Sequence, residues 1–121
     1  MELNGLELSQ MRTTAKEVCG LMKVLSNPDR LLLLCQLSQG EKRVGELEDL
    51  LGILQPTLSQ QLLVLRNAEL VQTRKEGKSI YYRISSSKAL AVMGVLYEQY
   101  EVPPVFRLPR GGVHATSFSF C

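Results

Sequence analysis

The sequence of 121 residues predicts a mainly α-helical domain with one β-hairpin, an α+β fold. Five segments repeat apolar residues with the period of a helix, and two β-prone runs around a glycine stand before the last of them. The length and the apolar content of 45% allow one packed core. We therefore expect one domain over residues 13–101, followed by a flexible tail of residues 102–121. Before it lies an N-terminal arm of residues 1–12, which is either loose or the start of a helix.

The N-terminal half contains three predicted helices. A helix over about residues 13–25 has an apolar stripe of Val18, Leu21, Met22 and Leu25. The motif Ser26-Asn27-Pro28-Asp29 then starts the next helix, because a cap residue, a proline and an acid are typical of a first turn. This second helix is apolar nearly all round and should be buried. A short third helix is expected at residues 44–51.

The segment 55–66 is predicted to form the second helix of a helix-turn-helix motif. Leu58, Leu62 and Leu65 form an apolar back, and the opposite front is uncharged. Pro56 suits the first turn, although Leu54 cannot cap it. Amide and hydroxyl side chains can hydrogen-bond base edges in a major groove. We expect base-edge or nearby phosphate contacts from Gln55, Thr57, Ser59, Gln60 and Gln61.

Two β-prone runs, residues 70–74 and 79–84, predict a hairpin whose turn contains Gly77 and whose tip is basic. A basic hairpin after a helix-turn-helix is typical of a winged helix-turn-helix, in which the wing meets backbone phosphates. Tyr81 and Tyr82 alternate along the strand, so one should pack inward, and Tyr82 is our candidate for a contact with DNA. The cations expected to contact phosphate are Arg66, Arg74, Lys75 and Lys78.

The last predicted helix follows Ser86 and has a stripe of Ala89, Val92, Met93, Leu96 and Tyr100. The first and last helices offer a dimer surface, and the alternative is that both only cover the monomer's core. Symmetric DNA readers pair half-sites by pairing subunits. We therefore expect a homodimer on a double-stranded DNA operator whose half-site centres lie about 34 Å apart, or a multiple of that.

Composition excludes several other classes. The N-terminus lacks the apolar segment of a signal peptide, and the longest apolar run, Leu31 to Cys35, cannot span a membrane. We expect a cytoplasmic protein with reduced thiols, no membrane partner and no cofactor. The single histidine, His114, and the lack of paired carboxylates argue against an enzyme. A protein-binding scaffold would need apolar or acidic residues on the front of the 55–66 helix, which has only Leu63.

The chain resembles the ArsR/SmtB family of small dimeric bacterial repressors. The resemblance lies in residues 25–31, 44–47, 55–66 and 77–83, and together these cover about residues 13–100 in order. It is similar to the BigR/SqrR/YgaV/HlyU branch of that family. The resemblance implies a winged helix that dimerises through its first and last helices and leaves its operator when an inducer binds. The family's metal-binding cysteines are replaced here by Arg43 and Gly45, and residues 87–100 contain neither His nor Asp, so no metal site is expected.

Members of this branch sense persulfides through two cysteines, one on the second helix and one late on the last. Cys35 matches the first position, and the second falls near Glu101 and is absent. Three interpretations stay open. Cys35 is a small apolar filler, it pairs with Cys19 or Cys121, or it is modified alone. The expected function is a dimeric DNA-binding transcriptional repressor, with thiol modification as the candidate trigger and a non-thiol inducer as the alternative.

Overall fold

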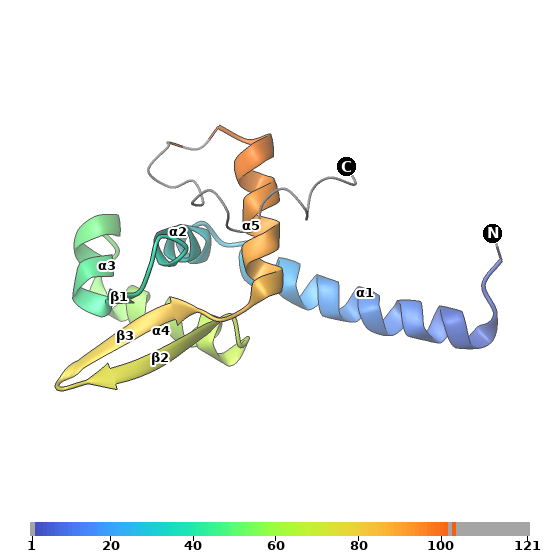
Figure 1. Ribbon diagram of the computed structural model, residues 1–121, viewed down its shortest axis with the longest axis horizontal. Helices are drawn as coiled ribbons and strands as arrows, with labels where there is room; N and C mark the ends of the chain where they lie inside the picture. Colours follow the sequence, from blue (N-terminus) through green and yellow to red (C-terminus); the bar gives the residue numbers. More distant parts are fainter. Residues whose placement is uncertain (1, 102, 104–121) are drawn as a thin grey trace.

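The computed structural model describes residues 2–101 and 103, and it has the mainly helical fold with a hairpin wing that the sequence predicts (Figure 1). The predicted tail, residues 102–121, lies outside the described residues apart from Pro103. The elements follow in the order α1 (Gly5–Leu25), α2 (Pro28–Leu37), β1 (Lys42–Arg43), α3 (Val44–Leu51), α4 (Gln55–Asn67), β2 (Val71–Glu76), β3 (Ser79–Ile84) and α5 (Ser87–Gln99).

The first helix is longer than the sequence predicts, because α1 begins at Gly5 and not near Thr13. Asn4 caps it: its Oδ1 accepts a hydrogen bond of 2.7 Å from the backbone N–H of Glu7. Of the two alternatives for the N-terminal arm, a loose segment or the start of a helix, the structure shows the second from Gly5 onward. Residues 2–20 are all exposed, and α1 runs away from the rest of the chain (Figure 1). Among the described residues, none of these side chains joins the hydrophobic core.

The core forms around α2, which packs against α1, α3, α4 and β3. Leu33 and Leu34 of α2 are fully buried, as expected for a helix that is apolar nearly all round. Around them lie buried side chains of the other elements: Leu47, Leu58, Leu62, Leu65, Val71, Ala89 and Met93. This shared core fixes α4 and the wing relative to each other.

The sheet has three antiparallel strands in the order β1-β3-β2. The hairpin pairs Val71 with Ile84 and Glu76 with Ser79, so its turn is only Gly77-Lys78. Gly77 has a φ of +62°, as the first turn position of a type II′ hairpin requires, and the turn places Lys78 at the tip of the wing. The short strand β1, which no pattern in the sequence predicts, pairs Lys42 with Tyr82 and Arg43 with Tyr81.

Candidate nucleic-acid interface

The front of α4 is an exposed and uncharged surface. Leu58, Leu62 and Leu65 are buried against the core, as the helical stripe predicts. Pro56 lies in the first turn, and Leu54 at the N-cap makes no side-chain hydrogen bond. The exposed front comprises Gln55, Pro56, Thr57, Ser59 and Gln60. We call α4 the recognition helix because its front can present hydrogen-bonding groups to a groove.

Three hydrogen-bonding side chains on or beside the front already have partners within the protein. Ser59 Oγ donates to Gln55 Oε1 at 2.7 Å, across one turn of α4. Gln61 is half-buried at the margin of the front, and its Oε1 accepts a hydrogen bond of 2.9 Å from Arg30 Nη1. In the described part of the chain, the side chains of Thr57 and Gln60 make no hydrogen bond. The sequence does not predict this contact of Arg30, because no local pattern indicates a hydrogen-bond partner 31 residues away.

The helix α3 and the turn after it hold the recognition helix in place. Glu46 Oε1 accepts a hydrogen bond of 3.1 Å from the backbone N–H of Arg43, which satisfies a free donor at the start of α3. Gly52, with a φ of +69°, ends α3 in the left-handed conformation that favours glycine. Leu47 of α3 is fully buried. The chain therefore turns sharply into α4, which is the geometry of a helix-turn-helix.

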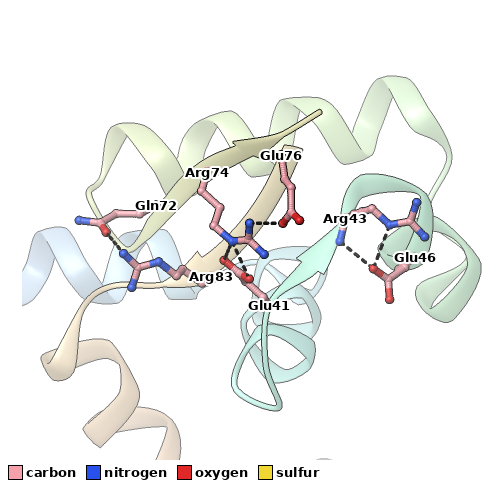
Figure 2. A network of polar contacts seen from close by, with 7 residues as sticks. All are labelled: Glu41, Arg43, Glu46, Gln72, Arg74, Glu76 and Arg83. Carbon is pink, nitrogen blue, oxygen red and sulfur yellow. Dashed lines mark hydrogen bonds and ion pairs between the residues drawn. The ribbon is translucent and has the colours of Figure 1, made fainter. Parts of the chain in front are cut away.

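The wing cations fall into two groups. Lys75 and Lys78 are exposed and make no ion pair with any residue in the described ranges. Arg74 instead donates from Nε to Glu41 at 2.9 and 2.7 Å and pairs through Nη1 with Glu76 at 2.5 Å (Figure 2). Its guanidinium also stacks on the Tyr81 ring, 4.4 Å from the ring centre. The hydrogen bond with Glu41, and after it the one with Glu76, raises the pKa of the Arg74 guanidinium above its ordinary value. The hydrogen bond with Arg74 in turn lowers the pKa of Glu41.

The remaining predicted DNA contacts differ in exposure. Arg66, in the last turn of α4, is exposed, so its guanidinium is accessible to a phosphate of the DNA backbone. Tyr82 is half-buried and packs against the hydrophobic core, so it is the inward member of the tyrosine pair. The pairing of β1 with β3 fixes which face of β3 packs inward, so the predicted contact of Tyr82 with DNA would come from the part of its side chain that stays exposed. Arg83, on the other face, donates to Gln72 at 2.8 Å across the hairpin (Figure 2).

The two cysteines within the described residues are both free, and Cys121 lies outside them. Cys19 is exposed on α1. Cys35 is half-buried on α2, where burial raises the pKa of its thiol and a weaker hydrogen bond from Tyr97 of α5 lowers it. Tyr97 Oη also lies 3.4 Å from Ser38 Oγ, and burial raises the pKa of this tyrosine. No cluster of three metal-binding side chains occurs among the residues that the structure describes.

A helix-turn-helix with an exposed polar front, followed by a basic hairpin, defines the chain as a winged-helix DNA-binding protein. Residues 27–73 match the family described as bacterial regulatory protein, arsR family. The chain is 48% identical to the biofilm growth-associated repressor of Agrobacterium fabrum over 103 residues, which are 85% of this chain and 88% of that protein.

Solved structures agree with this assignment. The transcriptional repressor BigR from Xylella fastidiosa superposes with a TM-score of 0.73 at 47% identity, over 78% of this chain and 97% of that one. The reduced form of HlyU from Vibrio cholerae gives a TM-score of 0.73 at 36% identity, over 77% and 98%.

The chain belongs to the ArsR family, in the branch of BigR and HlyU, and it is a DNA-binding transcriptional regulator and not an enzyme. None of the helices in the described ranges is long and apolar enough to cross a membrane.

Proposed function

We propose that this protein is a homodimeric repressor that binds a DNA operator with two half-sites and leaves it when Cys35 is modified. The observation that carries the DNA-binding part is the exposed, uncharged front of α4, together with two exposed wing lysines that have no ion pair within the described ranges. The front supplies donors and acceptors for base edges, and the lysines supply charge for phosphates. Repression is the activity that the names of the A. fabrum and X. fastidiosa relatives give to those proteins. Such a protein works where the chromosome is, in the cytoplasm.

The exposed side of α1 supports pairing with a second copy. Four exposed apolar residues, Leu8, Met11, Val18 and Met22, follow one another at spacings of three, seven and four residues. Ala15 fills the gap, so the pattern is the alternating three-and-four repeat of a coiled-coil seam. We call these five residues the α1 seam. A single chain leaves the α1 seam in water, and a second α1 would cover it.

The last helix offers a second apolar surface for the same contact. The residues that α5 buries within the chain are Ala89, Met93 and Gly94, whereas Leu90, Val95 and Leu96 stay partly exposed. Pairing through α1 and α5 would place the two recognition helices on the same side of a dimer and set the spacing of the half-sites.

The position of Cys35 supports a thiol trigger. Its Sγ lies on α2 against Tyr97 of α5, and α2 also packs against the recognition helix. A sulfur atom added to Cys35, transferred from a small persulfide that leaves as a thiol, would need space between α2 and α5. Because interiors are close-packed, that extra volume would displace one of the two helices. The alternative is an inducer that is not thiol-reactive, with Cys35 as a core residue.

The proposal is tested by a mobility shift on duplexes selected from a random pool by the reduced protein. Wild type and Cys35→Ser are compared after treatment with dithiothreitol, diamide or glutathione persulfide. We expect a complex with dyad-related half-sites, loss of the complex after persulfide treatment, and no loss for Cys35→Ser. If wild type selects no duplex, the operator proposal fails. If it selects a duplex and all treatments leave the complex intact, only the thiol trigger fails.

Cys19→Ser is the matched control for this experiment, because Cys19 is the exposed cysteine of α1. We expect it to respond like wild type. Loss of the response in Cys19→Ser as well would mean that the two cysteines act as a pair.

A further inference from the structure

Arg30, in the first turn of α2, joins the end of α1 to the recognition helix. Its Nε donates to the carbonyl of Val24 at 2.6 Å and its Nη2 to that of Lys23 at 3.3 Å. The last carbonyls of a helix have no partner within it, so these bonds cap α1. The third bond, from Nη1 to Gln61 Oε1 at 2.9 Å, reaches α4. One guanidinium therefore holds three helices in register.

This contact fixes which end of the Gln61 amide faces outward. A guanidinium can only donate hydrogen bonds, so Gln61 must turn its oxygen toward Arg30 and its Nε2 away. Within residues 2–101 Nε2 makes no hydrogen bond. No side-chain nitrogen or oxygen in the described residues is buried without a partner, so Nε2 reaches solvent. Gln61 thus presents its two N–H donors outward, while its oxygen is turned toward Arg30.

Gln60 is different, although it has the same side chain. It is exposed on the side of α4 opposite Leu58, and its amide can turn freely. A free amide can both donate and accept, as contact with adenine requires. Gln61 lies at the margin of the front, beside the apolar back. The margins of a helix in a groove lie nearest to the groove walls, which carry phosphate oxygens, and these only accept.

We propose that Arg30 fixes Gln61 as a hydrogen-bond donor, and that Gln61 gives this donor to a phosphate oxygen at the edge of the groove. Gln60 then reads a base, and Gln61 sets the position of the recognition helix along the DNA backbone. Arg30 is the positioning residue of this contact. The inference deepens the proposed function and rests on binding of the recognition helix to an operator.

Ethylation interference on a duplex selected by the wild-type protein tests the inference, because ethylation blocks individual phosphates. Gln61→Met has a side chain of similar length without a donor. We expect it to lose one interfering phosphate per half-site, to bind about tenfold more weakly and to keep the wild-type base preference. Gln61→Glu keeps an acceptor for Arg30 and should also lose that phosphate. The control Gln60→Met should show every interfering phosphate of the wild type. It should also relax the sequence preference at one base pair per half-site.

The outcomes separate the inference from the function on which it rests. A wild type that selects no duplex contradicts the operator proposal. If Gln61→Met shows every interfering phosphate of the wild type and binds with the wild-type affinity, Gln61 serves only to hold Arg30 and the inference is wrong. A changed base preference in Gln61→Met would also overturn it, since Gln61 would then read a base.

The role of Arg30 is tested by a conservative pair of variants in the same assay. Arg30→Lys keeps a cation that can only donate, so the phosphate should remain in the interference pattern. Arg30→Gln can donate or accept and no longer fixes Gln61, so the same phosphate should weaken. Thermal unfolding of both variants reports any loss of the α1 cap. Equal patterns for the two variants, with both folded, would show that Arg30 does not position Gln61.

Discussion

Arg74 of the wing is bound to Glu41, which lies 33 residues earlier, just before β1. The Nε–Oε2 distance is 2.7 Å (Figure 2), and the guanidinium also lies over the Tyr81 ring. The pair ties the wing to the segment that leads into the helix-turn-helix. Because Glu41 and Glu76 both neutralise Arg74, this cation adds no net positive charge to the wing. We therefore expect Arg74 to orient the wing and the two wing lysines to meet phosphate.

Salt dependence separates these roles. Replacing Lys75 and Lys78 together with alanine removes four lysines from a dimer, so it should weaken binding to all sequences and lower the slope of log K against log salt by about four. Arg74→Ala should weaken binding with the slope unchanged, because no phosphate contact is lost. The measurement is fluorescence anisotropy of labelled duplex at several salt concentrations. A slope that falls by about two in Arg74→Ala, about one for each protomer, would instead assign Arg74 to a phosphate.

The α1 seam should control the oligomeric state. Met11→Glu with Met22→Glu places charge in the seam, and we expect the dimer to dissociate to monomers that bind DNA more weakly. Met22 is 62% exposed in the single chain, so the variant should still fold. Leu6→Glu is the control, since Leu6 is 80% exposed on the other side of α1. Sedimentation equilibrium gives the oligomeric state of both variants. If only Leu6→Glu dissociates the dimer, the α1 seam is not the dimer contact.

Reactivity should differ between the two described cysteines and should depend on pH. Burial raises the pKa of Cys35, so its thiolate fraction at pH 7 is smaller than that of an ordinary thiol. Alkylation of Cys35 by iodoacetamide should be slower than that of exposed Cys19 and should rise about tenfold per pH unit from neutrality. Tyr97→Phe removes the bond that lowers this pKa and should slow Cys35 further. Mass spectrometry of each modified peptide gives the rates, and a fast Cys35 at neutral pH would contradict this ordering.

The missing cap of α4 offers a stabilising substitution. Leu54 has the extended backbone of an N-cap residue, and the second helical position is Pro56, which has no N–H. Leu54→Ser would accept a hydrogen bond from the Thr57 N–H and should raise the free energy of unfolding by about 1 kcal/mol. Leu54→Ala lacks the acceptor and should be close to neutral. Urea unfolding at equal protomer concentration compares them, and equal stability of the two variants would rule out a capping effect.

The sequence by itself determined the helices, the wing and the front of the recognition helix, because these depend on local patterns. The stripe of Leu58, Leu62 and Leu65 separates the back of α4 from its front, and Gly77 marks the hairpin turn. These features follow from helical periodicity and from the conformational freedom of one glycine. The family resemblance follows from the same segments.

Only the tertiary structure decided which polar groups meet. Arg30 finds Gln61, Arg74 finds Glu41 and Cys35 meets Tyr97 across separations that no sequence period encodes. The two-residue strand β1 is too short to show a pattern, yet its pairing with β3 places Tyr82 inward. Packing around α2 brings together side chains that are far apart in sequence. Two neighbouring glutamines therefore differ: Gln61 is held by Arg30, and the amide of Gln60 can turn to donate or accept.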